Sequence, residues 1–246
     1  MNRKILFAVT SSLLVSGSAI AADVPMKAPP APVVAAAYSW TGIYAGISFG
    51  WDRERFNWTY TNPVPFIPPH SLTGDAGLLD GHIGYQHQWQ QFVFGVEGAL
   101  SLPTNGSFAV FVPCAPAANL ASQCQARATS LRTLGGRLGW ATGSWLFFGT
   151  GGWATANVIT RELTVPPVVF DVSQIHHHSG GYVGGGIEYG VTNNFVVGVE
   201  YQHVSLNTLF HASSADAFGP SPPGVNGRNI TPTMDIIRAR LTAKFP

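Results

Sequence analysis

The chain has 246 residues, of which only 10% are charged, and its formal net charge is +1 at pH 7. Ordinary soluble domains carry about 25% charged residues, so this composition is not typical of a soluble globular domain. A net charge near zero also argues against a nucleic-acid partner. Beyond the N-terminal segment, no stretch offers the roughly 18 consecutive apolar residues of a membrane helix. A chain that spans lipid without helices must form a closed barrel, because only closure satisfies every backbone N–H and C=O group.

The N-terminus has the features of a secretory signal peptide over residues 1–21. A basic tip precedes an apolar run, and the small-residue exit Ala19-Ile20-Ala21 places cleavage after Ala21. The alternative is an N-terminal membrane helix, but the run is short and is broken by Ser and Gly. We expect residues 22–37, rich in Pro and Ala, to form an extended periplasmic leader, and residues 38–246 to form the barrel domain.

Eight stretches with period-two alternation follow, each about as long as the 9–11 residues of a tilted membrane strand. They cover residues 40–51, 78–89, 92–102, 130–141, 145–158, 181–191, 195–205 and 233–245. Tight turns at Gln90-Gln91, Thr142-Gly143-Ser144 and Thr192-Asn193-Asn194 alternate with long connections over 52–77, 103–129, 159–180 and 206–232. This pattern predicts an all-β, eight-stranded antiparallel up-and-down transmembrane barrel in a Gram-negative outer membrane. The short turns and both termini are expected in the periplasm, and the long loops outside the cell.

Aromatic residues flank every predicted tight turn and both ends of the barrel domain. Such clustering is typical of the aromatic girdle where a barrel leaves the lipid. The expected periplasmic girdle consists of Trp40, Trp89, Phe92, Trp140, Trp145, Tyr189, Phe195 and Phe245.

Charged residues alternate with large apolar residues in several strands, which assigns the charges to the lumen. A charge that faces lipid at mid-depth costs roughly 2–4 kcal/mol, so inward placement is favoured. The expected lumen network consists of Asp80, Glu97, Arg137, Glu188, Glu200, Arg238, Arg240 and Lys244. An eight-stranded lumen is only wide enough for side chains, so these ions are expected to plug it with salt bridges.

Several blocks in order resemble the small outer-membrane immunogenic and haemin-binding proteins, within the OmpA-like β-barrel class of porin-family proteins. These blocks are YSWTGIYAGISFGW (38–51), FVFGVEG (92–98), GGRLGWA (135–141), FGTGGWA (148–154), GGGIEYGVTNNFVVGVEY (184–201) and RARLTAKF (238–245). The resemblance implies a monomeric barrel, a surface antigen, and haemin binding in some members. One departure is Pro246 after Phe245, since such chains end in the aromatic residue read by the barrel-assembly machinery.

The two cysteines, Cys114 and Cys124, lie in the second long connection. We expect a disulfide between them, because the mature chain leaves the reducing cytoplasm. Two free thiols and a metal-binding pair are the alternatives.

Two further groups of residues could bind a ligand or catalyse a reaction. His176, His177 and His178 could bind haem or a metal, but neighbours in an extended chain point opposite ways, so a solvated polar loop is favoured. His70-Ser71 with Asp75 could be imagined as an esterase or acyltransferase site, although three residues of one loop prove nothing without geometry. His82 and His203, on strands, are expected to be hydrogen-bonded or interfacial histidines.

The sequence therefore predicts a structural, surface-exposed envelope protein without enzyme activity, metal or cofactor. A haemin-binding or narrow-pore protein is the alternative. Its expected partners are outer-membrane lipid and lipopolysaccharide, and the barrel-assembly machinery during biogenesis; no nucleic acid is expected.

Overall fold

The computed structural model describes residues 38–61, 69–104, 109–111, 122–164, 171–212 and 227–245. The expected signal peptide (1–21) and leader (22–37) lie outside these ranges, as do Cys114 and Pro246. The strands are β1 (Gly42–Tyr60), β2 (His70–Trp89), β3 (Phe92–Pro103), β4 (Ala109–Phe111), β5 (Ser122–Thr142), β6 (Trp145–Thr164), β7 (Asp171–Gly190), β8 (Phe195–Leu206), β9 (Leu209–Ala212) and β10 (Gly227–Phe245). Over the same ranges, no helix is long and apolar enough to cross a membrane.

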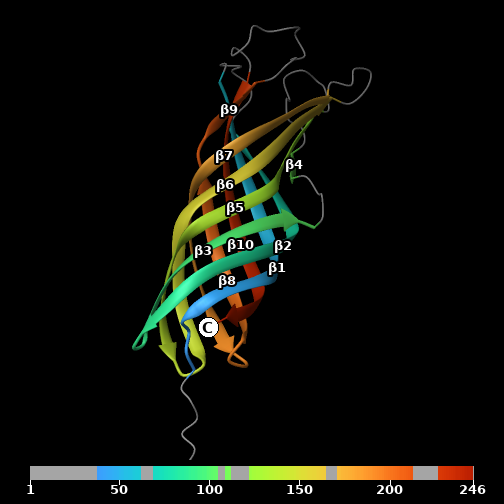
Figure 1. Ribbon diagram of the computed structural model, residues 1–246. Coiled ribbons are helices and arrows are strands. Elements are labelled where there is room, and N and C mark those ends of the chain that lie inside the picture. Colours follow the sequence, from blue (N-terminus) through green and yellow to red (C-terminus); the bar gives the residue numbers. More distant parts are fainter. Residues whose placement is uncertain are drawn as a thin grey trace, which may run out of the picture. The chain divides into compact units, whose positions relative to one another are not determined.

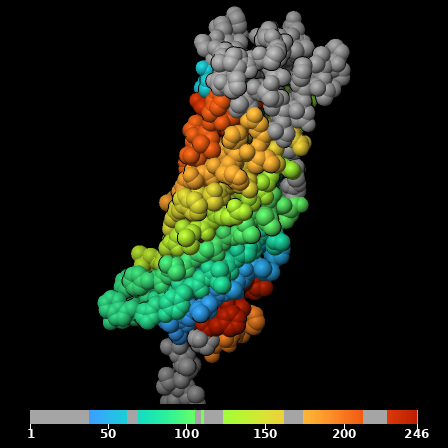
Figure 2. Space-filling model, turned by 45° about the horizontal axis from the view of Figure 1, so that its top comes forward, coloured from blue at the N-terminus to red at the C-terminus, as the bar shows by residue number. Residues whose placement is uncertain are grey.

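The eight long strands form one closed antiparallel ring. β1, β2, β3, β5, β6, β7, β8 and β10 pair in chain order, and β1 returns to β10 from Ile43↔Phe245 to Tyr60↔Arg228. The short strands extend this ring, β4 beside β5 and β9 beside β10. The strands wrap obliquely around the barrel (Figures 1 and 2). The predicted eight-stranded up-and-down barrel is confirmed.

The tight turns lie together at one end of the barrel, which we call the turn end. Gln90, in the turn between β2 and β3, has a φ of 56°, and Gly143, between β5 and β6, has a φ of 58°. Such left-handed backbone suits two-residue hairpin turns, because it matches the twist of the strands. The C-terminus lies at this end as well (Figure 1). The opposite end is called the loop end.

Most strands extend further toward the loop end than the sequence predicted. β1 continues to Tyr60, beyond the expected end at residue 51, and β7 begins at Asp171 and not at residue 181. The reason is that the polarity of the two faces is exchanged while their alternation continues: Phe56 and Trp58 are buried inside the barrel, and Arg53 and Arg55 face outward. The apolar residues of the outer face therefore end before the strand does, and the sequence pattern predicts long connections where strand residues lie.

A register shift between Ala128 and Ser130 explains the misplaced start of β5. A β-bulge adds one unpaired residue, so the facing of the side chains changes parity across it. Residues 122–128 belong to β5, although the sequence pattern predicts them to be part of the connection 103–129. β4 and β9 also lie in segments expected to be connections.

Large apolar side chains are exposed around the turn-end half of the barrel. This lipid-facing band includes Ile47, Phe49, Trp51, Leu79, Ile83, Val96, Leu100, Leu134, Leu138, Phe147, Trp153, Val183, Ile187, Val199, Tyr201, Ile237 and Leu241. Toward the loop end, the outer face becomes mostly polar, as at Arg53, Arg55 and Arg132. The strands are therefore longer than a bilayer requires, and their loop-end parts lie beyond the band.

The core is the lumen, which contains three apolar clusters along the barrel. Trp40, Val93, Ala141, Leu146, Phe148 and Val196 form the turn-end cluster. Leu78, Ala128, Leu131, Ala154, Ala156, Tyr182, Val204, Leu206, Met234 and Ile236 form the middle cluster. Phe56, Trp58, Leu72, Ala109, Cys124, Ala126, Val158 and Ile230 form the loop-end cluster. Charged side chains occupy the space between the turn-end and middle clusters.

Candidate functional site: the lumen charge network

Seven of the eight charged residues assigned to the lumen meet in one buried network. Six strands place them at inward positions: β2, β3, β5, β7 and β8 carry one each, and β10 carries two. The members are Asp80, Glu97, Arg137, Glu188, Glu200, Arg238 and Arg240, each no more than 8% exposed. The alternation of the strands thus brings together charges that lie far apart in the sequence.

Arg240 is the centre of the network, since its guanidinium contacts three carboxylates. Its Nη2 atom donates to Glu97 Oε2 at 2.6 Å, and its Nε lies 3.2 Å from Glu188 Oε1. Its Nη1 also donates to Glu200 Oε2. The planar guanidinium suits this role because it presents several fixed donors at once.

Two further arginines complete the chain of ion pairs across the lumen. Arg137 Nη2 donates to Glu188 Oε2 at 2.7 Å, and its guanidinium lies 4.0 Å from the centre of the Phe148 ring. Arg238 joins Asp80, at 2.7 Å, to Glu200, at 3.2 Å. Every carboxylate of the network therefore contacts at least one arginine.

Other polar side chains also hold the carboxylates, and of these Tyr44 and Ser101 were not identified from the sequence. The Tyr44 hydroxyl donates to Glu97 at 2.9 Å, and Ser101 Oγ donates to Asp80 at 2.7 Å. His82 Nδ1 lies 3.5 Å from Asp80. Their inward parity on the predicted strands was the available signal, but only charge was used to select lumen residues.

Lys244 is buried but does not join the ion pairs, which corrects the prediction. Its ammonium group donates to the carbonyl of Ser39 and lies 4.4 Å from the centre of the Tyr38 ring. Lys244 is close to the C-terminal end of β10, so it reaches the turn end of the lumen, where these residues lie.

Trp40 also departs from its expected place in the aromatic girdle. It is fully buried in the turn-end cluster, and its backbone N–H donates to Gln88 Oε1 at 2.8 Å. The residue precedes β1 and folds inward, where it packs edge-on against Tyr38 with ring centres 4.8 Å apart. The other members of the expected girdle are exposed: Trp89, Phe92, Trp140, Trp145, Tyr189, Phe195 and Phe245.

Glycines leave room for two large side chains in the lumen. A Cβ atom at Gly84 would collide with the Tyr44 hydroxyl, and one at Gly135 would collide with the Tyr182 hydroxyl. These close approaches let aromatic rings lie across a narrow lumen without displacing the strands.

The histidine triplet lies in β7 and not in a solvated loop. His178 is fully buried; its Nδ1 donates to the Asn207 carbonyl at 2.9 Å, and its Nε2 lies 3.0 Å from Nε2 of His211. His177 faces outward, so the expectation that neighbours point opposite ways is confirmed. In the part of the chain that the structure describes, no group of three or more His, Cys, Asp or Glu side chains could hold a metal ion.

His178 and His211 lie beyond the lipid-facing band, near the loop end. Burial, with contributions from His176, His178 and Arg228, lowers the pKa of His211 to about 3. Burial also lowers the pKa of His178. Both rings are therefore neutral near pH 7, which fits their direct contact.

Two other sequence-based hypotheses concern residues that the structure places on strands. Cys124 is buried in β5 and not in a connection, while Cys114 lies outside the described ranges, so their disulfide stays a prediction. His70 faces inward, Ser71 bonds outward to Asn57, and Asp75 pairs with Arg53 at 3.3 Å. The imagined esterase site at His70-Ser71 is therefore wrong.

Comparison with known proteins identifies similar barrels. The family described as outer membrane protein beta-barrel domain matches residues 13–231. The 31 kDa outer-membrane immunogenic protein of Brucella melitensis biotype 1 is 30% identical over 200 residues, covering 77% of this chain and 81% of the relative. The 25 kDa outer-membrane immunogenic protein of Brucella ovis is 36% identical over 101 residues, covering 39% and 45%.

Solved structures of outer-membrane proteins are more distant in sequence. OprG of Pseudomonas aeruginosa is 12% identical with a TM-score of 0.43, covering 85% of this chain and 98% of that chain. The outer membrane protease OmpT of Escherichia coli is 11% identical with a TM-score of 0.46, covering 83% of this chain and 97% of that chain.

Proposed function

This chain belongs to the outer membrane protein beta-barrel domain family, and we propose that it is a structural, surface-exposed barrel with a closed lumen. The observation that supports this proposal best is the network around Arg240, which spans the lumen from β3 to β7 and β8. Apolar clusters lie on both sides of the network along the barrel. Side chains thus fill the path that an ion or solute would have to take.

Opening such a lumen would be costly. Moving Arg240 aside would leave three buried carboxylates without one of their partners. Breaking a buried pair in this way typically costs about 3–5 kcal/mol. A narrow pore would require that cost at each opening, so we favour a barrel that contributes to envelope integrity and presents its loop end to the environment.

The proposal includes an orientation and a set of partners. The short turns and both termini would face the periplasm, and the long connections would face outward, as is usual for bacterial barrels. The lipid-facing band would contact outer-membrane lipid, with lipopolysaccharide in the outer leaflet. The barrel-assembly machinery would insert the chain, and the barrel would act as a monomer.

Haemin binding, the alternative suggested by resemblance, has less support. Both ring nitrogens of His178 are engaged, one by the Asn207 carbonyl and the other by His211. An axial ligand needs a free ring nitrogen, so binding at this histidine would require the pair to separate. A haemin titration of the folded barrel would test it: no Soret shift is expected, and a saturable shift lost in His178→Gln would favour this alternative.

Planar-bilayer recording tests the closed lumen. The folded wild-type barrel should give no long-lived conductance steps, because the ion pairs and clusters fill the lumen. A double variant, Trp40→Ala with Arg240→Ala, removes a side chain from the turn-end cluster and the centre of the network, and should raise the conductance. Large, stable steps from the wild-type protein would contradict the proposal. Protease cutting on intact cells would test the orientation, since cleavage at the tight turns would invert it.

A further inference from the structure

The outer face of the barrel carries a serine and a histidine on one strand, and an aspartate on the next strand contacts that histidine. His203 and Ser205 are two residues apart on β8, so both side chains leave the same outer face. Asp235, on the neighbouring strand β10, pairs in register with His203. His203 Nδ1 lies 2.8 Å from Asp235 Oδ1. Because a carboxylate only accepts, Nδ1 carries a proton in this contact, and Nε2 is the nitrogen that can act as a base.

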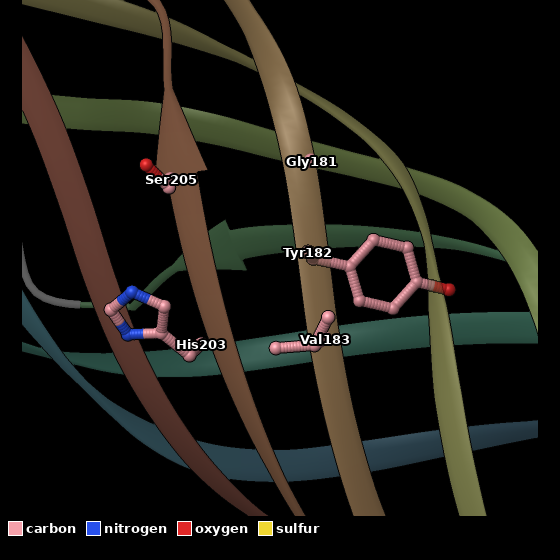
Figure 3. A pocket seen from close by; sticks show the side chains of 5 residues that line it. All are labelled: Gly181, Tyr182, Val183, His203 and Ser205. Atoms are coloured by element: carbon pink, nitrogen blue, oxygen red, sulfur yellow. The ribbon is translucent and has the colours of Figure 1, made fainter.

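Asp235 is itself held in place. The Tyr201 hydroxyl donates to the same Asp235 oxygen at 2.6 Å. The acid therefore orients the histidine as the third member of a nucleophile–base–acid arrangement does. Figure 3 shows Ser205 above His203 in the view, with one ring nitrogen on the side of the ring nearer the serine and the serine oxygen turned away from it. Catalytic hydrogen bonds often tighten only when substrate binds, and rotation about the serine Cα–Cβ bond would then turn its hydroxyl toward the ring.

A groove lies directly beside these side chains. It is open to the outside, has a volume of about 380 Å³, and is lined by Gly181, Val183, His203 and Ser205 together with Tyr182, whose ring is buried in the middle cluster (Figure 3). Gly181 pairs in register with Ser205 and has no side chain to cover the hydroxyl. Asn207, exposed two residues beyond Ser205, accepts the Ser179 N–H with its Oδ1 atom, which leaves its Nδ2 group as a donor for an oxyanion at this face.

The surroundings indicate what kind of molecule would fit. Val183, Tyr201 and Ile237 belong to the lipid-facing band, so acyl chains would reach the groove from the membrane side. On the loop side, Arg53 pairs in register with Asp235, and Arg55 lies two residues further along the outer face of β1. Guanidinium groups bind phosphate oxygens well. A lipid with an acyl ester beside a phosphate would fit this site at the edge of the lipid-facing band. Its acyl chain would lie toward the apolar band, its ester at the nucleophile, and its phosphate near the arginines.

We propose that Ser205, His203 and Asp235 form an acyl-ester hydrolase site for a phosphate-bearing membrane lipid. Ser205 Oγ attacks the ester carbonyl carbon while His203 Nε2 takes the hydroxyl proton. The ester C–O bond breaks, and the lipid alcohol leaves with that proton, which gives an acyl-serine. Water then attacks the acyl-serine with the same base, releasing a fatty acid and restoring Ser205, so the net reaction is ester plus water to acid plus alcohol. This inference departs from the expectation that the chain is not an enzyme.

The chain contains a matched control on the neighbouring strand. His177 and Ser179 have the same spacing on the outer face of β7. His177 Nδ1, however, contacts the side-chain oxygen of Asn157, which is an amide and not a carboxylate. A serine and a histidine are thus present in both places, while the acid accompanies only His203. Ser179→Ala tests whether any exposed serine of this barrel suffices.

The test uses the full mature chain, folded in mixed micelles with lipid. One arm contains phosphatidylethanolamine and the other contains lipopolysaccharide, and released fatty acids are measured by mass spectrometry. The wild-type protein should release fatty acid in at least one arm, which identifies the lipid source. Ser205→Ala should lower the rate at least ~1000-fold, as for loss of a catalytic nucleophile. A fluorophosphonate probe should label the peptide that contains Ser205.

Further variants separate positioning from folding. Asp235→Asn should lower kcat by ~100-fold or more with little change in KM, because the acid orients His203 and does not contact lipid. Ser179→Ala should keep the wild-type rate. Each variant is first checked for the gel migration of the folded barrel. No fatty-acid release by the folded wild-type protein in either arm, or equal release by Ser205→Ala, would overturn the proposal.

Discussion

Replacing Arg240 by alanine is the most direct test of the lumen network. The side chain contacts Glu97, Glu188 and Glu200, and its loss removes one positive charge from a site with four carboxylates and three arginines. Each of the three acids would keep one arginine: Glu97 and Glu188 keep Arg137, and Glu200 keeps Arg238.

Because no acid is left entirely alone, we expect a cost near the lower end of the range for breaking buried pairs, about 3 kcal/mol. That cost is roughly a hundredfold change in the unfolding equilibrium. Urea unfolding of the folded barrel in micelles measures it, and the temperature at which the faster gel migration is lost gives an independent readout. Arg55→Ala is the control, because Arg55 is exposed on the outer face. A shift for Arg240→Ala no larger than that of Arg55→Ala would refute the inward network as a source of stability.

Three other changes test the lumen and the histidine pair. Trp40→Ala should destabilise the barrel by about 3–5 kcal/mol in urea unfolding, since a fully buried indole is lost. Replacing the exposed Trp145 by alanine should cost much less; equal effects would contradict the burial of Trp40. Gly84→Ala should cost about 1–3 kcal/mol, because the added Cβ collides with the Tyr44 hydroxyl; an unchanged unfolding midpoint would contradict this close packing. The pKa of His211 is lowered from 6.5 to about 3, so the unfolded chain binds more protons between these values and stability should fall as pH drops from 6.5 toward 3. Thermal midpoints at pH 7 and pH 5 measure this slope, which should be shallower in His211→Gln; an equal slope would exclude this histidine as the cause.

Period-two alternation was enough to determine the number and order of the barrel strands, and the facing of those in which charges alternate with large apolar residues. The apolar outer positions and the charged inner positions of β10 appear directly in RARLTAKF, and the same reasoning placed Glu97, Glu188 and Glu200 in the lumen. This succeeded because lipid imposes a strong local rule: a strand in a bilayer must be apolar on one face, whatever its neighbours are.

The same rule explains why the predicted loop-end limits of the strands are wrong. Beyond the bilayer the outer face meets water and the lumen is filled by apolar residues, so in β1 the inner face becomes apolar at Phe56 and Trp58. The loop-end halves of the strands lack the apolar outer face of a strand in lipid, so the sequence pattern predicts connections there. The bulge at Ala128 and Ser130 had the same effect on β5, because parity changes there.

Contacts between strands were decided only by the closed barrel. Which carboxylates Arg240 reaches depends on ring closure and stagger, and the burial of Trp40 and the position of Lys244 depend on the width of the turn end. The His203 and Asp235 side chains meet because β8 and β10 pair in one register, although 32 positions separate them in the chain. By contrast, the neighbouring residues His70 and Ser71 point to opposite faces. Proximity in the sequence fixes the face of a side chain, whereas its partners across the sheet are fixed by register, which is a property of the whole barrel.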